Sequence, residues 1–502
     1  MSTSSASFAD RLFHAYDIRI DASLLSKERA TQLFDAVAVY AKEQLHVEAI
    51  VVCRDARLSG NTLQSQAIDH FLNLGFTVYS ELNPITTCQF YYACACLGRV
   101  MGLMLGASHN PASYTGQKLV GPYCTPIAEQ IGPAGGLSAI RTYFEEGRKL
   151  ESGSQRGQLI CLSEQERYIQ DCLSRSGVEP SSFAGMKVVV DFLNGSSAPE
   201  ILRALQIAGV EVVARNMVPD GSFPNGPPNP ILAQSTSSTF SYLAEHPDYD
   251  FCLLFDGDGD RVDVVARGLK AVEPSLVMAF LAPILKGMAK SEGRVSIGFD
   301  PKANPLLVNS IIRYGIEPTL IPNGHSKIKG LLVEQASRGL LAGVEESAHY
   351  YLSLSYEGRE VAIESTLLIT LLFLKTWREE TDRFSDLLAL QTGVARKREW
   401  GYTYPSASLR LHALSEVEQA FLAQGYEALK TQTDGKPLGS TLLRLGMAGE
   451  SKLWACISQR SSESEEGIAR WSVVASDGAI LAECVNVIEG IASRDAVGSY
   501  HG

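Results

Sequence analysis

Two short stretches of the sequence carry side chains that together could transfer a phosphoryl group. The first, Gly106–Pro111, reads GASHNP and places Ser108 beside His109. An apolar run ends just before it, and the Asn-Pro pair stops any helix or strand, so the sequence predicts Ser108 on a turn. A serine oxygen can accept a phosphoryl group when nearby side chains, here His109 and Lys118, move protons and offset charge. An ordinary Ser-Asn-Pro turn is the alternative.

The second stretch, Asp256–Arg261, reads DGDGDR and follows the apolar run Phe251–Phe255. Alternating carboxylates on a loop with glycines can converge on one hard cation through oxygen ligands. An EF-hand calcium loop is excluded, because Arg261 and Arg267 stand where it requires a glycine and a glutamate. The pattern predicts a magnesium site with Arg261 available to a phosphate, and a solvated acidic turn is the alternative. The three aspartates are Asp256, Asp258 and Asp260.

These loops are expected where buried strands end. Apolar runs of strand length alternate with helical stretches over most of the chain, which is the β-α-β order typical of parallel sheets. The carboxyl ends of parallel strands meet at one edge of a sheet, so their loops can share a site. Another such loop, Glu345–His349, offers a glutamate and a serine that could hydrogen-bond sugar hydroxyls, or it is a solvated turn.

From about Ser385 the pattern changes to strands and helices without parallel crossovers, which favours an α+β domain. A strand predicted at Leu453–Ser458 leads into Gln459–Gly467, where Arg460 stands beside several serines. An arginine beside hydroxyls can bind phosphate, whereas the glutamates of this stretch would also suit a solvated hairpin.

Composition limits the classes of protein that the chain could be. A chain of 502 residues is too long for one hydrophobic core. The net charge of -12, without a basic stripe, argues against nucleic acid and anionic membranes as partners. The ten cysteines are irregularly spaced, which suits neither a zinc knuckle nor a disulfide framework and favours a reducing compartment. With no apolar targeting segment, we expect a cytoplasmic protein that binds small molecules.

On these residues the chain resembles the α-D-phosphohexomutases, most closely their bacterial phosphomannomutase and phosphoglucomutase branch. The phosphoserine loop of that family resembles Ala107–Pro111, its metal loop resembles Asp256–Arg261, and its sugar-binding loop resembles Glu345–His349. Weaker matches are Tyr16–Arg19, Lys118, Lys302 and Asn323–His325. The resemblance implies three similar α/β domains and a C-terminal α+β domain around a central cleft. The expected boundaries are 1–158 for the phosphoserine domain, 159–267 for the metal domain, 268–386 for the sugar domain and 387–502 for the phosphate domain.

The resemblance also implies an isomerase that interconverts hexose 1-phosphate and hexose 6-phosphate, with mannose or glucose as the sugar. Phosphorylated Ser108 would pass its phosphate to the sugar, form a hexose 1,6-bisphosphate and take back the other phosphate. One Mg²⁺ and hexose 1,6-bisphosphate as activator are the expected cofactors, and the expected state is a monomer or homodimer. The expected catalytic residues are Ser108, His109, Lys118 and Arg261, and the expected metal ligands are Ser108, Asp256, Asp258 and Asp260. The expected substrate-binding residues are Tyr16, Arg19, Lys302, His325, Glu345, Ser347, His349, Arg460, Ser462 and Ser464.

The loop after Arg460 departs most from the family pattern. Glu463 and Glu466 replace residues that are uncharged in the family, and acids disfavour a bound phosphate. This motivates an alternative function, a catalytically weak sugar-phosphate-binding protein that retains the mutase cleft. A plain phosphatase is a third hypothesis. An alignment through Met447–Lys452 is also possible, but it places Leu445 where the family has arginine, so we prefer the alignment through Arg460.

Overall fold

The computed structural model describes residues 7–153, 155–289, 293–462 and 467–501, which form two compact units. The mixture of helices and several sheets confirms the predicted α/β class. Within the described residues, none of the helices combines the length and hydrophobicity needed to cross a membrane. The first unit comprises Met1–Ala271, His325–Glu334 and His349–Lys375, and the second comprises Val272–Gly324, Gln335–Ala348 and Thr376–Gly502.

The first sheet of the first unit places the serine stretch after a buried strand. Its strands are β1 (Ile18–Asp21), β2 (Ala49–Arg54), β3 (Thr77–Ser80), β4 (Met101–Leu105), β5 (Tyr114–Gly121), β6 (Thr125–Ile127) and β7 (Leu159–Cys161). The order is β1-β5-β4-β2-β3-β7, with β2 parallel to β3 and β4 and with β5 antiparallel to β4. Every residue of β4 is buried, which explains why this strand is a continuous apolar run.

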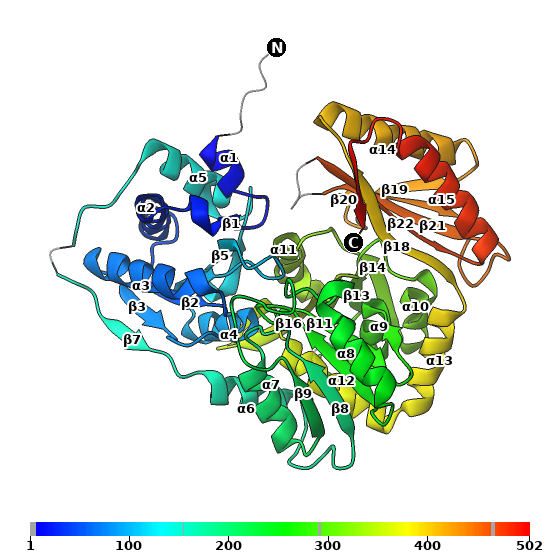
Figure 1. The fold of residues 1–502 in the computed structure, drawn as a ribbon, viewed down its shortest axis with the longest axis horizontal. Helices are drawn as coiled ribbons and strands as arrows, with labels where there is room; N and C mark the ends of the chain where they lie inside the picture. Colours follow the sequence, from blue (N-terminus) through cyan, green and yellow to red (C-terminus); the bar gives the residue numbers. More distant parts are fainter. Residues whose placement is uncertain (1–6, 154, 290–292, 463–466, 502) are drawn as a thin grey trace. The chain divides into compact units, whose positions relative to one another are not determined.

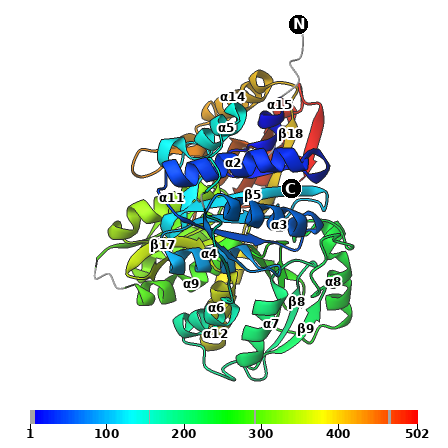
Figure 2. The ribbon, with the colours of Figure 1, turned by 90° about the vertical axis from the view of Figure 1, so that its left-hand side faces the viewer.

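Five helices pack against this sheet in the described part of the first unit. They are α1 (Phe8–Leu12), α2 (Lys27–Glu43), α3 (Leu58–Asn73), α4 (Thr87–Leu97) and α5 (Leu137–Glu146), with short 3-10 turns at Ala22–Leu24, Pro122–Cys124 and Pro133–Gly135. Helix α2 begins where the Ser26 hydroxyl accepts a hydrogen bond from the Arg29 backbone N–H, and its buried stripe includes Leu33 and Val37. Helices α2 and α3 lie side by side (Figure 2), where Gln66 donates to the Thr31 hydroxyl.

The second sheet places the acidic stretch between two strands. Its elements are α6 (Gln165–Ser176), β8 (Lys187–Asp191), α7 (Ala198–Ile207), β9 (Glu211–Arg215), α8 (Ala233–Glu245), β10 (Phe251–Phe255), β11 (Val262–Ala266) and β12 (Lys270–Val272). Strand β8 pairs in parallel with β9 and β10, and β11 is antiparallel to β10. The predicted strand at Phe251–Phe255 is therefore confirmed, and Asp256–Arg261 is the turn that follows it.

The first unit also contains a hairpin and most of two helices from later in the chain. These are α11 (His325–Gln335), β16 (Tyr350–Tyr356), β17 (Arg359–Glu364) and α12 (Thr366–Glu379). Strands β16 and β17 are antiparallel, and Glu364 is the last residue of β17.

The second unit begins with parallel strands. The elements are α9 (Pro274–Met288), β13 (Val295–Phe299), α10 (Pro305–Ser310), β14 (Ile316–Leu320), β15 (Leu340–Val344) and α13 (Thr381–Thr392), with 3-10 turns at Ile312–Tyr314 and Ala336–Arg338. Strand β13 pairs in parallel with both β14 and β15.

The last part of the second unit is an antiparallel sheet, as the predicted α+β pattern requires. Its elements are β18 (Ala395–Thr403), α14 (Ala407–Leu422), β19 (Glu427–Thr431), β20 (Pro437–Leu445), β21 (Ala455–Ser461), β22 (Ile468–Ala475), α15 (Gly478–Ala492) and β23 (Gly498–His501). The strand order is β19-β20-β21-β22-β18-β23. Helices α14 and α15 cover one face (Figure 1), and residues such as Phe421 and Ile488 pack there with Trp471.

The strand predicted at Leu453–Ser458 is displaced in the structure. Strand β21 continues to Ser461, so Arg460 lies on a strand rather than in the predicted loop. The polar residues that indicated a loop are instead satisfied within the sheet, since the side chain of Gln459 is buried and accepts a hydrogen bond from Trp471 Nε1 at 3.0 Å.

Candidate active site

Ser108 lies on a turn, as its sequence context predicted, and the backbone of this turn is strained. The φ angle of Ser108, 48°, is in the left-handed region, which non-glycine residues adopt only when their surroundings impose it. The buried guanidinium of Arg57 imposes it here by donating to the backbone carbonyls of Ser108 at 2.8 Å and Asn110 at 2.6 Å. Asp55 pairs with Arg57 at 3.2 Å and accepts from the Ala107 backbone N–H at the same distance. The turn is therefore held by groups outside it.

The serine hydroxyl meets the acidic turn. Ser108 Oγ donates to Asp256 Oδ2 at 3.0 Å and lies 3.2 Å from His109 Nδ1. Lys118 Nζ donates to Asp258 Oδ2 at 2.7 Å and to Asp260 Oδ2 at 2.5 Å. The structure thus brings together the residues that were predicted from two stretches of sequence far apart in the chain.

The three aspartates fit a metal ion. One carboxylate oxygen from each lies within 4.8 Å of the other two, and all three side chains are buried. Among the described residues, Asp258 Oδ1 and Asp260 Oδ1 have no hydrogen-bond partner. Buried oxygens with free lone pairs suit a hard divalent cation.

The electrostatics of this cluster agree with a site for a cation. Burial, and then the neighbouring carboxylates of Asp258 and Asp260, raise the pKa of Asp256 well above its ordinary value. Burial alone would lower the pKa of Lys118, but the carboxylates of Asp258 and Asp260 raise it above the ordinary value. Negative charge is therefore concentrated here, and positive charge is favoured.

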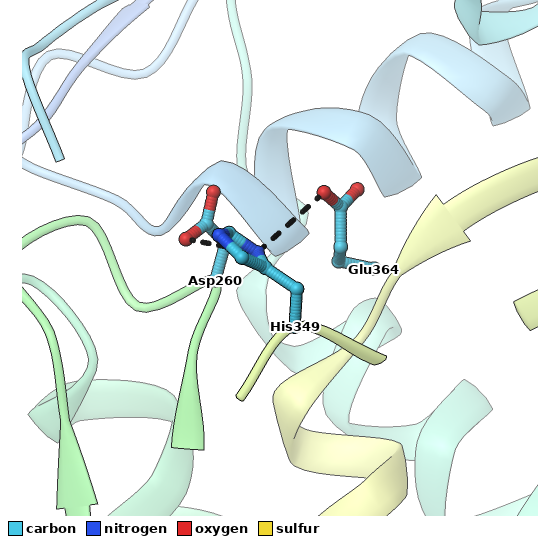
Figure 3. Close-up of side chains that lie close together, drawn as sticks. All are labelled: Asp260, His349 and Glu364. Carbon is cyan, nitrogen blue, oxygen red and sulfur yellow. Dashed lines mark ion pairs between the residues drawn. The ribbon is translucent and has the colours of Figure 1, made fainter. Parts of the chain in front are cut away.

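Arg261 and His349 continue the cluster. Their backbones form an isolated β-bridge, and Arg261 Nε donates to His349 Nε2 at 2.9 Å. An arginine nitrogen can only donate, so His349 Nε2 accepts and the neutral ring carries its proton on Nδ1. That nitrogen lies 3.7 Å from Asp260 Oδ1 and 3.9 Å from Glu364 Oε1 (Figure 3). Burial, and then Arg261, lower the pKa of His349 well below its ordinary value, which keeps the ring neutral.

The tautomer of His349 decides between two groups of possible metal ligands. Asp260, His349 and Glu364 also place one ligand atom each within 4.8 Å of the others. A protonated Nδ1 has no lone pair for a metal, and Nε2 already accepts from Arg261, so the ring of His349 offers no free ligand atom. The aspartate trio is therefore the better metal site.

Three further predicted residues have defined contacts: Arg19 contacts the serine turn, and Tyr16 and His325 contact each other. Arg19 pairs with Asp17 at 2.7 Å and donates from Nη1 to Asn110 Oδ1 at 2.7 Å, so it contacts the turn. The rings of Tyr16 and His325 pack edge to face with centroids 5.6 Å apart.

The remaining predicted residues belong to the second unit. Glu345 is buried and accepts from the Gly324 backbone N–H at 3.0 Å, while Ser347 is half-buried. Lys302 and Arg460 meet at the carboxylate of Glu399, at 3.4 Å and 3.1 Å. Ser462 is buried. Ser464, Glu463 and Glu466 lie outside the described residues.

Sequence reasoning missed three residues of these clusters. Arg57 had a signal, because the stretch Arg-Asp-Ala-Arg begins at Arg54, the last residue of the apolar strand β2. Glu364 had a weaker one, a single acid that ends the buried segment Val361–Glu364. Glu399 had none, since it stands in the mixed charged stretch KREW.

Comparisons with known proteins identify a family. Residues 10–134 match the family model for phosphoglucomutase/phosphomannomutase, alpha/beta/alpha domain I, and residues 166–268 match that for domain II. The chain is 32% identical over 361 residues to a phosphomannomutase/phosphoglucomutase of Pseudomonas syringae pv. tomato, covering 71% of this chain and 72% of that protein. It is 31% identical over 391 residues to one of Pseudomonas aeruginosa, covering 77% and 79%.

Solved structures show the same fold. A phosphoglucomutase/phosphomannomutase family protein of Burkholderia thailandensis superposes with a TM-score of 0.80 at 22% identity, covering 98% of this chain and 99% of that one. The open form of parafusin, a phosphoglucomutase of Paramecium, gives a TM-score of 0.72 at 16% identity, covering 99% and 98%. The predicted family is therefore confirmed: the chain belongs to the α-D-phosphohexomutases, in their bacterial phosphomannomutase/phosphoglucomutase branch, and is an isomerase of that type.

Proposed function

We propose that this enzyme interconverts hexose 1-phosphate and hexose 6-phosphate, with mannose or glucose as the sugar, through phosphoserine at Ser108 and a hexose 1,6-bisphosphate. The observation that carries the proposal is the position of Ser108 Oγ, 3.0 Å from Asp256 at the edge of a buried trio of aspartates. A hydroxyl beside a cation site can carry a phosphoryl group whose charge is offset there. The names of the relatives support mannose and glucose phosphates as the substrates.

The aspartate trio, with an oxygen of phosphorylated Ser108, would hold one Mg²⁺, which would offset charge on the transferring group. In the first half-reaction the P–O bond at Ser108 breaks, a P–O bond to the free sugar hydroxyl forms, that hydroxyl loses a proton and Ser108 Oγ gains one. In the second, the other P–O bond of the bisphosphate breaks, the P–O bond at Ser108 re-forms, the serine hydroxyl loses its proton and the freed sugar oxygen gains one. His109 Nδ1 lies 3.2 Å from Ser108 Oγ and would exchange a proton with it. Lys118 would move the proton of the sugar hydroxyl, and Arg261 would bind the transferring phosphate.

The second unit would bind the rest of the substrate. Glu345 and Ser347 would hold the sugar, and Arg460 would hold the phosphate that does not react. Lys302, Ser462 and Ser464 would assist Arg460, and Tyr16, Arg19, His325 and His349 would complete the binding surface. Hexose 1,6-bisphosphate would load Ser108, and the four-domain division at 158, 267 and 386 remains part of this proposal.

Replacing the nucleophile tests the function directly. Ser108→Ala should abolish conversion of glucose 1-phosphate and mannose 1-phosphate, measured by ³¹P NMR with hexose 1,6-bisphosphate present. The matched control is Ser113→Ala, because Ser113 lies on the same loop and is exposed. Mass spectrometry should find phosphate on Ser108 in the wild type. Near-normal turnover by Ser108→Ala would rule out the assignment.

The alternative of a catalytically weak binding protein is separated by the same assays. It predicts that the wild type binds hexose phosphate but shows no turnover even with bisphosphate. A phosphatase would instead release inorganic phosphate as its main product.

A further inference from the structure

Three cations of the second unit converge on one carboxylate. Arg460 contacts both oxygens of Glu399, with Nη2 3.1 Å from each and Nε 3.3 Å from Oε2. Arg470 Nη1 donates to Oε1 at 2.8 Å. Lys302 Nζ lies 3.4 Å from Oε2 and 3.2 Å from Asp300. The two carboxylate oxygens are surrounded by three cationic side chains, which is how proteins also bind an oxyanion such as phosphate.

The sheet itself directs Glu399 to this position. Lys397 pairs with Val473 and Trp400 with Trp471, so two residues of β18 lie opposite one residue of β22, which is a β-bulge. Bulges redirect side chains, often near functional sites. Glu399 is one of the two residues in the bulge.

The arginines require an anion between them. Arg460 and Arg470 lie directly opposite each other on β21 and β22. Like charges in such a pair destabilise a sheet unless a counter-charge separates them. Burial alone would raise the pKa of Glu399, but Lys302, Arg460 and Arg470 lower it well below the usual range, so the counter-charge is permanent.

We propose that the Glu399 carboxylate occupies the oxyanion position of the phosphate subsite, and that the non-reacting phosphate of the substrate must displace it to reach Arg460. The inference rests on the proposed role of Arg460. Glu399 would then determine the affinity and specificity of the subsite for phosphate. Only an anion that the arginines bind more strongly than a carboxylate, such as a phosphate dianion, can replace it between them.

Binding of inorganic phosphate to the full chain tests the proposal without relying on turnover. Titration calorimetry is carried out at constant ionic strength on the wild type and on Glu399→Gln, which keeps the size of the side chain and removes its charge. We expect Glu399→Gln to bind inorganic phosphate about tenfold more tightly, since the phosphate no longer displaces a charge-assisted hydrogen-bonded carboxylate.

Thermal melting provides a second measurement. Without phosphate, Glu399→Gln should melt below the wild type, because the opposed arginines lose their counter-charge. Phosphate should raise the melting temperature of Glu399→Gln more than that of the wild type. If Glu399→Gln does not fold, the same measurements are made on Glu399→Asp, whose shorter carboxylate should compete less well.

Two control variants test whether the gain in phosphate affinity comes from removing the charge of Glu399 and depends on Arg460. Glu489 pairs at 2.5 Å with Lys397, which lies on β18 as Glu399 does, but Glu489 itself lies outside the cluster. The Glu489→Gln variant should therefore bind phosphate as tightly as the wild type does. Arg460→Ala, added to Glu399→Gln, should abolish the gain. If the gain persists in this double variant, the phosphate binds elsewhere and the subsite is wrong.

The other outcomes are equally decisive. Weaker, unchanged or undetectable phosphate binding by Glu399→Gln would show that Glu399 is a brace for the arginines, and would overturn the inference. A gain in affinity by Glu399→Gln in a protein without mutase turnover would support the inference and refute the proposed function.

Discussion

A single hydrogen bond fixes the tautomer of His349. Arg261 Nε donates to His349 Nε2, which leaves Nδ1–H facing the carboxylates of Asp260 and Glu364. Glu364 is in turn paired with the buried Lys329 at 3.2 Å. The hydrogen bond from Arg261 therefore orients the ring, and the ring in turn orients Arg261.

This arrangement predicts a spectroscopic result. In ¹⁵N NMR of the histidine side chains, the wild type should show His349 protonated at Nδ1 and unprotonated at Nε2. Arg261→Met removes the donor and should shift the ring toward the Nε2–H form. His349→Gln assigns the signal. A predominant Nε2–H form in the wild type would contradict the assigned contact.

At the scale of elements, a buried acid joins two helices of the first unit. Glu200 lies in the first turn of α7, and Thr86, which caps α4, donates to it at 2.9 Å. Burial raises the pKa of Glu200 to about 8, against an ordinary value of 4.5. The folded protein therefore holds this proton more tightly than the unfolded chain does.

Because the pKa of Glu200 is raised in the folded protein, the stability of the fold should fall as the pH rises. The contribution of Glu200 is complete below about pH 4.5 and is lost as the pH rises through about 8, by up to about 5 kcal/mol. Glu200→Gln cannot ionise, so the free energy of unfolding of the wild type minus that of the variant should fall over this interval. Urea denaturation at several pH values measures it. The exposed Glu166 provides a control, since Glu166→Gln should give a curve parallel to the wild type. A parallel curve for Glu200→Gln would refute the prediction.

Elements were easier to predict than the contacts between them. Strands β4 and β10 are continuous apolar runs, and the turns after them carry Ser108 and the aspartates, so a local pattern revealed both. The role of Arg57 depends on carbonyls more than fifty residues away, and that of Glu399 on a bulge and on strands far along the chain. No local pattern records such contacts. Strand β21 was misplaced because polar residues buried in a sheet resemble a loop in sequence.

At the scale of the whole molecule, an acidic protein must bind an anionic substrate. The net charge of -12 opposes phosphate at long range, so affinity would depend on local cations. The cluster of Lys302, Arg460 and Arg470 provides local positive charge. The aspartate trio would provide it only when a metal is bound.

Metal removal should therefore affect both activity and stability. Chelation should stop turnover, and Mg²⁺ should restore it. Mg²⁺ at about 100 times its dissociation constant should stabilise the fold by about 2.7 kcal/mol, seen as a higher melting temperature. Asp258→Asn should reduce this shift. Full activity restored by Ca²⁺ but not by Mg²⁺ would contradict a magnesium site.

The way Arg57 holds the serine turn has a consequence for the energetics of a catalytic cycle. Its guanidinium donors are used by backbone carbonyls, so the shape of the turn depends on the protein and not on whatever is attached to Ser108. A serine that gains and loses a phosphoryl group in every cycle would then do so on an unchanging backbone. Little reorganisation of the turn would accompany either transfer step, which would keep the barrier between the two states low.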